Sequence, residues 1–356
     1  MMPNNNTLVK KIIIIFSILS LSMLFIIIVF FNNNKSNYFK GRLLIGKSFH
    51  QQNVLGRPSG ILYSAGKLII FDRSPISDGK QVSIYNSETH KLLYSFGRKG
   101  SGPGEYQGLW SIDRKVANEN KITLLDLILH RYTIFDITDS TKIEIDTMIT
   151  LKEGEAYCPV FVNDSTIISI GGLLKQGRFA EYGLDGNIRK YLGELLPGKK
   201  SETPIPIHQQ ASIGRLKVTP DGSKYVICAY ESDYIDIYNN DGTLKKRIEG
   251  PLGLPPQYKV RWIAGEPNCA FDQEKGVSCY LDIALSNDKI YALYSGEPSK
   301  NPEVAGRYLH VYNMEGRFIE TLIVDNKLRK ISYDPFKRQL FGIQVSPLPE
   351  LYMYQL

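Results

Sequence analysis

The chain has 356 residues, of which 43% are hydrophobic and 22% are charged, so its composition supports a packed core and excludes wholesale disorder. The formal net charge is +7, but lysine and arginine are interspersed with carboxylates along the whole chain. We interpret the basic excess as an ordinary solvated surface and expect no nucleic-acid partner.

The N-terminal segment predicts a membrane anchor. Residues 1–11 form a short polar tail, and residues 12–31 are uncharged and apolar on every face of a helix. Some 20 residues at a helical rise of ~1.5 Å match the ~30 Å hydrocarbon core of a bilayer. We therefore predict an uncleaved signal anchor. A cleaved signal peptide is the alternative, although its apolar region is shorter, about 7–15 residues, and ends in a small-residue cleavage site.

The orientation follows from the flanking charges. Lys10 and Lys11 precede the apolar run, and Lys35, Lys40 and Arg42 follow it, so the count is nearly balanced. The short tail and its lysine pair favour a tail on the inside and a body on the outside. We expect the bilayer as a partner through residues 12–31, a polar tether at residues 32–40, and a body in the periplasm or outside the cell.

Residues 41–356 repeat one unit of four strand-like runs. In each unit an apolar hairpin with an Asn, Asp or Gly turn is followed by a second, more polar hairpin; TPDGSKYVICAY and IDIYNNDGTLKKRIE are one such pair. The spacing is near that of propeller repeats. The units begin near Ser59, Gly108, Cys158, Ile213, Tyr280 and Leu328.

The ends of this repeat predict a closed ring. The last unit finishes with LYMYQL and lacks a fourth strand, whereas RLLIGKSFHQ, before the first unit, has no partner. If the N-terminal strand completes the last blade, no sheet edge stays open. We predict an all-β, six-bladed propeller with four-stranded blades. Seven blades are the alternative, because the stretch from Pro251 to Cys279 is long enough to contain further strands.

A glycine-rich loop, SFGRKGSGPGEY at residues 95–106, separates the first two units. No helix pattern and no Lys-Ser or Lys-Thr pair follows, which argues against a phosphate-binding loop. We interpret it as the crossing between two blades, with Arg98 or Lys99 paired to Glu105. The alternative is a binding loop in which these three residues contact a partner.

The repeats and this loop together resemble the six-bladed propellers of the NHL and TolB-like kind, as in cell-envelope proteins of Bacteroidetes. In that family the loop reads G-x-K-G-x-G-P-G-E-[FY], which the residues from Gly97 to Tyr106 match. The resemblance covers residues 42–356. It implies the fold strongly and the function weakly, because such propellers include uncharacterised envelope proteins, interaction modules and a few enzymes.

The same resemblance supplies an enzymatic alternative. Propeller lyases and lactonases of this shape hold a divalent ion on the axis with carboxylate, Asn or His side chains. The candidates here are Asp113, His208 and Asp282, with Asp334 as a further one, and Ca²⁺ or Zn²⁺ as the metal. Each of them also has an explanation as a turn or exposed residue. We find no GxSxG elbow and assign no catalytic residue.

Two further features leave alternatives open. The four cysteines contain no CxxC pair, so no structural zinc is expected; Cys269 and Cys279 either form a disulfide or, as we favour, stay free thiols. Arg261 and Trp262 lie in an insertion rich in proline and glycine. They are candidates for partner contact, but packing of Trp262 between blades is the favoured interpretation.

The sequence thus predicts a membrane-anchored, outward-facing propeller of the cell envelope. We expect it to bind a protein, peptide or glycan without catalysis and without a cofactor. The alternative is a propeller lyase or lactone hydrolase with an axial divalent metal.

Overall fold

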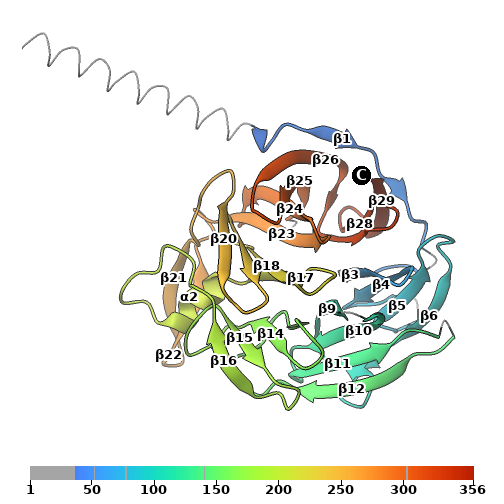
Figure 1. The fold of residues 1–356 in the computed structure, drawn as a ribbon, viewed down its shortest axis with the longest axis horizontal. Helices are drawn as coiled ribbons and strands as arrows, with labels where there is room; N and C mark the ends of the chain where they lie inside the picture. Colours follow the sequence, from blue (N-terminus) through green and yellow to red (C-terminus); the bar gives the residue numbers. More distant parts are fainter. Residues whose placement is uncertain (1–36, 52, 77, 117, 140, 302–303) are drawn as a thin grey trace, which may run out of the picture.

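The computed structural model describes residues 37–356 except 52, 77, 117, 140 and 302–303. The predicted anchor at residues 12–31 lies outside the described residues. Within the described ranges, no helix combines the length and apolarity needed to cross a bilayer. This part of the chain is almost entirely β structure, and its sheets stand as blades around a central axis (Figure 1).

The first four blades are each two consecutive hairpins, with strands in chain order across the sheet. The first strand of each blade lies innermost and the fourth outermost (Figure 1). Their strands are β3 (Pro58–Ser64), β4 (Lys67–Asp72), β5 (Val82–Asn86) and β6 (Leu92–Phe96); β9 (Leu109–Lys115), β10 (Asn118–Asp126), β11 (Arg131–Asp136) and β12 (Glu144–Thr150); β13 (Val160–Phe161), β14 (Ile167–Ile170), β15 (Phe179–Tyr182) and β16 (Ile188–Leu192); β17 (Gly214–Val218), β18 (Lys224–Ala229), β19 (Tyr234–Asn239) and β20 (Leu244–Glu249).

The last two blades contain the N-terminal strands as well. Blade 5 consists of β23 (Val277–Leu285), β24 (Lys289–Pro298), β25 (Gly306–Asn313) and β26 (Phe318–Leu328), and β1 (Arg42–Leu44) adds to its outer edge in parallel with β26. Blade 6 consists of β27 (Lys330–Asp334), β28 (Gln339–Gln344) and β29 (Glu350–Gln355), and β2 (Lys47–Ser48) pairs antiparallel with β29.

The predicted closure is therefore confirmed, with one refinement. The stretch RLLIGKSFHQ is not a single strand: its first half lies on blade 5 and only its second half completes blade 6. The residues described contain six blades. The seven-blade alternative is wrong, because the stretch from Pro251 to Cys279 contains a separate hairpin of β21 (Tyr258–Ile263) and β22 (Glu266–Phe271) on the outside of the ring (Figure 1).

The hydrophobic core is divided among the interfaces between successive blades. Ile69 and Phe71 of blade 1, for example, pack with Leu109 and Ile122 of blade 2. Equivalent apolar clusters join every further pair around the ring, and Phe49 and Tyr85 meet Phe341 where blade 6 returns to blade 1. The second strand of blade 1, β4, is buried on both faces over Leu68–Asp72, which explains its continuous apolar run, KLIIFD.

Candidate functional site

The beginnings of the innermost strands meet at one end of the axis and enclose a cavity. Ser59 of β3, Trp110 of β9, Arg215 of β17, Ser278 of β23 and Lys330 of β27 all line it, and its volume is about 350 Å³. Because every blade starts with its innermost strand, the fold brings residues from distant parts of the sequence to this one place. We call this cavity the axial pocket.

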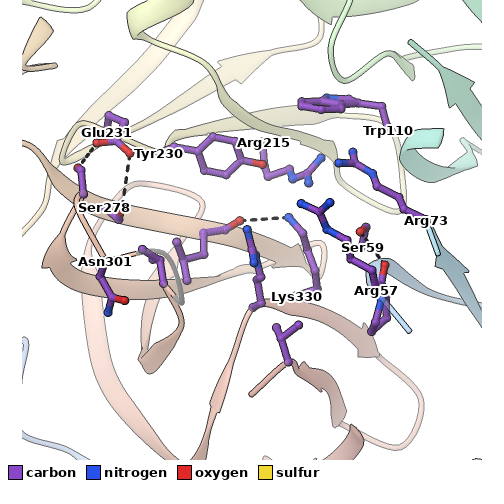
Figure 2. Close-up of a pocket in the computed structure, with 16 residues that line it drawn as sticks. Arg57, Ser59, Arg73, Trp110, Arg215, Tyr230, Glu231, Ser278, Asn301 and Lys330 are labelled. Atoms are coloured by element: carbon purple, nitrogen blue, oxygen red, sulfur yellow. Dashed lines mark hydrogen bonds between the residues drawn. The ribbon is translucent and has the colours of Figure 1, made fainter. Parts of the chain in front are cut away.

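Positive charge dominates the axial pocket. Figure 2 shows the guanidinium groups of Arg57, Arg73 and Arg215 and the Lys330 amine directed toward a common region, and Arg329 also lines the pocket. The Arg73 Nε donates a hydrogen bond to the Leu109 carbonyl oxygen at 2.8 Å, and the Arg73 guanidinium carbon lies 4.6 Å from the ring centre of Trp110. Arg73 is therefore held in place by the backbone and by an aromatic side chain.

Few carboxylates neutralise these cations. Within the described residues, no carboxylate oxygen lies within 4.0 Å of a side-chain nitrogen of Arg57, Arg73, Arg329 or Lys330. Arg215 approaches Asp282 at 3.8 Å, but an oxygen of Asp282 also accepts a hydrogen bond from the Ile331 amide at 3.0 Å.

Burial and the neighbouring positive charges lower the pKa of two members of the cluster, Lys330 and Arg73. Lys330 is only 8% exposed, and within the described residues its amine has one hydrogen-bond acceptor, the Leu281 carbonyl oxygen at 3.5 Å. Burial, with a contribution from the Arg215 charge, lowers the pKa of Lys330 to about 7. Burial and the charges of Arg215 and Arg57 lower the pKa of Arg73 to about 10.

The opposite side of the axial pocket has a different character. There Glu231 accepts hydrogen bonds from the hydroxyls of Ser278, at 3.4 Å, and Ser299. In the view of Figure 2, Glu231, Ser278 and Asn301 lie across the pocket from Arg57 and Arg73. The pocket thus combines a cationic side with a side of hydroxyl, amide and carboxylate groups.

The three proposed metal ligands are not brought together. Asp113 lies toward the other end of the axis, where its carboxylate pairs with Lys217 at 3.1 Å. Asp282 lies between the two ends, beside Arg215. The further candidate, Asp334, accepts backbone hydrogen bonds from Phe336 and Lys337 in a turn. In the described ranges, no three His, Cys, Asp or Glu side chains are grouped to hold a metal ion.

His208 has a structural environment instead. It lies in α2 (Ile205–Ala211), outside the innermost strands, where its Nε2 donates to the Leu196 carbonyl oxygen and its Nδ1 is 2.8 Å from the Tyr258 hydroxyl. Burial lowers the pKa of His208, so the imidazole is neutral at pH 7. It therefore fixes α2 to the loop before it.

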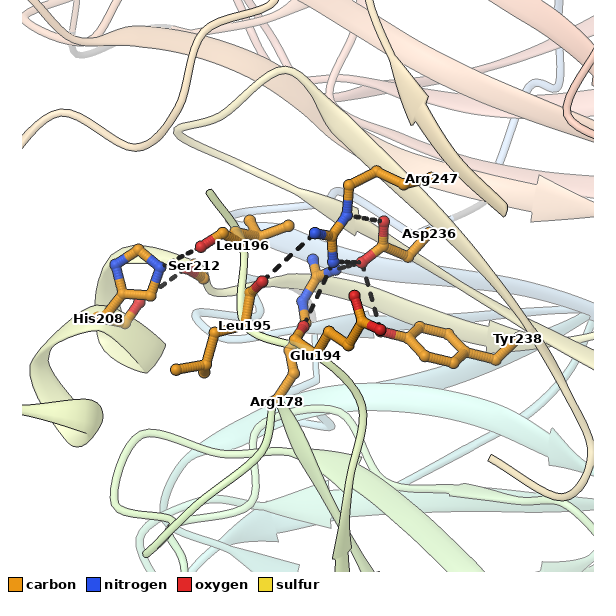
Figure 3. Close-up of polar contacts among 9 residues, drawn as sticks. All are labelled: Arg178, Glu194, Leu195, Leu196, His208, Ser212, Asp236, Tyr238 and Arg247. Carbon is orange, nitrogen blue, oxygen red and sulfur yellow. Dashed lines mark hydrogen bonds and ion pairs between the residues drawn. The ribbon is translucent and has the colours of Figure 1, made fainter. Parts of the chain in front are cut away.

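That loop is also held by a buried ionic network, shown in Figure 3. Asp236 of blade 4 is fully buried and pairs with Arg178 of blade 3 and with Arg247 of its own blade, the latter at 2.8 Å. Arg247 also donates to the carbonyl oxygens of Glu194 and Leu195. The network connects two blades and the loop that carries Leu196, so it is structural rather than part of a site.

The glycine-rich loop connects blade 1 to blade 2, as the crossing interpretation predicts. Its strands β7 (Arg98–Lys99) and β8 (Glu105–Tyr106) pair in parallel, and Gly97 and Gly104 have φ of 77° and 73°, which favours glycine. The expected ion pair of Glu105 with Arg98 or Lys99 is wrong: within the described residues Glu105 instead accepts a hydrogen bond from the Gly102 amide at 2.9 Å. Arg98 and Lys99 are exposed.

The structure also places Arg261, Trp262 and the four cysteines. Arg261 and Trp262 lie on β21, and Trp262 is 70% exposed, so the favoured interpretation of Trp262 as a packing residue between blades is wrong. Cys269 and Cys279 are free thiols, as are Cys158 and Cys228.

The cationic cluster was not predicted from the sequence, although the sequence contains a signal for it. A basic residue stands at or next to the start of the innermost strand in three blades: Arg57 before β3, Arg215 in β17, and Arg329 and Lys330 at β27. Aligning the predicted units by their first strands places these residues at one end of the ring.

Comparisons with known proteins agree with this architecture. The family model described as "TolB-like 6-blade propeller-like" matches residues 44–335. A solved structure of a member of the DUF4221 family from Bacteroides vulgatus is 11% identical, covers 89% of this chain and 96% of its own, and has a TM-score of 0.53. A putative exported protein from Bacteroides fragilis is 13% identical over 87% of this chain and 94% of its own, with a TM-score of 0.52.

At these identities the two structures show a common fold alone. No protein of curated function matches the sequence. The family model spans residues 44–335, which is most of the chain, and its description as a six-blade propeller agrees with the architecture described above. The chain therefore belongs to the family of TolB-like six-bladed β-propellers.

Proposed function

We propose that this protein is a non-catalytic binding module of the bacterial cell envelope, which holds an anionic group of a protein, peptide or glycan in its axial pocket. In this proposal residues 12–31 anchor the chain in the membrane, and the propeller lies in the periplasm or outside the cell. The apolar run and its flanking lysines support the anchor and its orientation.

One observation carries the proposal: four arginines and the Lys330 amine converge on a cavity in which, among the described residues, Glu231 is the one carboxylate of the lining. Like charges in a partly buried cluster repel one another and lower the stability of the fold. A carboxylate or phosphate group entering the pocket relieves this repulsion, and arginine side chains bind such groups in a bidentate geometry. The same excess of positive charge opposes a divalent metal on the axis, so no observation favours the enzymatic alternative.

Fluorescence offers a direct test, because the chain has only two tryptophans and one of them, Trp110, lines the pocket. In the full-length Trp262→Phe protein, Trp110 is the sole tryptophan. Titration with acetate and with inorganic phosphate should change its emission with saturation. Replacing the two exposed arginines of the pocket, as Arg57→Ala with Arg329→Ala, should weaken binding about tenfold or more.

The matched control is Arg98→Ala with Lys99→Ala, which removes the same charge from an exposed loop outside the pocket. It should leave binding unchanged. An equal loss in this control would assign binding to the glycine-rich loop, and the absence of any saturable response to either anion would refute the proposal. N-terminal sequencing of the mature protein distinguishes an uncleaved anchor from a cleaved signal peptide. A start near residue 32 would show cleavage.

A further inference from the structure

The two sides of the axial pocket differ in chemistry, and this difference limits the chemical class of the ligand. The cationic side carries Arg57 and Arg73, and the opposite side carries Glu231 and Ser278 (Figure 2). The Ser299 hydroxyl donates a hydrogen bond to Glu231 on that opposite side. A ligand that fills about 350 Å³ touches both sides, since this volume exceeds that of a single carboxylate or phosphate group. Its two ends therefore meet different chemistry.

Glu231 limits the charge of the ligand group that lies on its side of the pocket. A second anionic group there would lie against the Glu231 carboxylate, so polyanions fit poorly. A ligand ammonium would pair with Glu231 but would share the pocket with four arginine side chains, which repel it. A neutral group with hydroxyl donors satisfies both constraints.

The groups around Glu231 match such a neutral, hydroxylated end. The carboxylate oxygens already accept from Ser278 and Ser299, and each oxygen retains capacity for a further donor. The two serine hydroxyls have lone pairs left to accept hydrogen bonds in turn. A polyol or sugar presents several adjacent hydroxyls, each a donor and an acceptor, and thus suits this side of the pocket.

We infer that the ligand of the axial pocket is a sugar acid, with its carboxylate on the arginine side and its hydroxyls on the side of Glu231, Ser278 and Ser299. This inference rests on the proposed function and names its ligand class. The carboxylate interacts with Arg57, Arg73 and Arg329, and Glu231 accepts from a sugar hydroxyl. A uronic acid residue of an envelope glycan has this chemistry.

The test compares four probes on the full-length Trp262→Phe protein: glucuronate, acetate, glucose and 6-aminohexanoate. Glucuronate should bind at least tenfold more tightly than acetate, and glucose should give no saturable response. Glu231→Gln should reduce the advantage of glucuronate over acetate about tenfold while leaving acetate binding at least as strong, because a repulsive charge is removed. Thermal unfolding of this variant checks that it folds.

The outcomes separate this inference from the proposed function. If acetate binds and glucuronate binds no more tightly, or if Glu231→Gln keeps the full advantage of glucuronate, the sugar-acid inference fails while the anion site stands. Tighter binding of 6-aminohexanoate than of glucuronate would also overturn it, in favour of a ligand with an ammonium group. If none of the acids binds, both the inference and the proposed function fail.

Discussion

Lys330 shows how the axial pocket lowers the stability of the fold at a single residue. Its amine is buried, with no carboxylate within 4.0 Å in the described part of the chain, so Lys330→Met removes a buried charge without leaving a partner behind. We expect the free energy of unfolding at pH 7 to rise by about 1 kcal/mol or more. Chemical denaturation of the variant, with Lys337→Met at an exposed ion pair as control, measures this.

The same substitution has a pH signature. The pKa of Lys330 is lowered from 10.5 to about 7 in the folded state, so between these values the unfolded state binds more protons and wild-type stability rises with pH. The stability advantage of Lys330→Met should therefore shrink between pH 7 and pH 9.5. An advantage that stays constant over this range would show that Lys330 is not neutralised on folding.

His310 gives a second pH effect, of acid destabilisation. It is fully buried; its Nε2 donates to the Tyr38 carbonyl oxygen at 3.0 Å, and its Nδ1 has no hydrogen-bond partner within the described residues. Burial lowers the pKa of His310 from 6.5 to about 3. Below pH 6.5 the His310 imidazole binds a proton in the unfolded state but not in the folded state. The free energy of unfolding therefore falls as the pH falls.

Between pH 7 and pH 5 this residue should account for a loss of about 2 kcal/mol in the free energy of unfolding. His310→Gln, which retains a donor for Tyr38, should lose that much less over the same interval. His208, whose pKa is also lowered, remains in both proteins and cancels in the comparison. Urea unfolding at the two pH values measures the difference, and identical losses in both proteins would contradict the assignment.

At the scale of elements, the β21–β22 hairpin is an appendage of the ring rather than part of its packing. Trp262 and Ile263 are 70% and 60% exposed. Trp262→Ala should therefore change the free energy of unfolding by less than about 0.5 kcal/mol. A loss of several kcal/mol in thermal or chemical unfolding would restore the packing interpretation of this residue.

The interface between blades 3 and 4 depends on Asp236. Its removal leaves the Arg178 guanidinium buried without a counter-charge, because Arg178 is 2% exposed and pairs with Asp236. Asp236→Ala should cost about 3–5 kcal/mol of stability. Asp185→Ala, which breaks the exposed pair with Arg189, is the control and should cost less than about 1 kcal/mol. Similar losses in the two variants would contradict the structural role of the network.

At the scale of the whole molecule, closure of the ring depends on residues 41–48. Replacing them by a Gly-Ser linker of equal length removes β1 and β2 and leaves β29 and β26 with open edges. We expect a lower melting temperature and aggregation on concentration, measured by calorimetry and light scattering. Leu43→Ala, at an exposed position of the same segment, should behave like the wild type. An unchanged melting temperature in the linker variant would show that closure adds little.

The sequence predicted the ring well and the pocket poorly, for a physical reason. The predicted units begin close to β3, β9, β13, β17, β23 and β27, because hairpin turns and apolar runs are local signals. The axial pocket combines Arg57, Arg215 and Lys330, which lie far apart in sequence and meet only when the ring closes. The acids proposed for a metal site, Asp113 and Asp282, lie beside cations that no local pattern reveals.

The pairing of β2 with β29 also bears on the time course of biosynthesis. Lys47 finds its partner, Met353, only when almost the whole chain has been made. At ~5–20 residues per second, ribosomes need roughly 15–60 s for this span, during which β2 stays unpaired. The first four blades can each form their hairpins as they emerge from the ribosome, but β2 has no partner strand until β29 has been made.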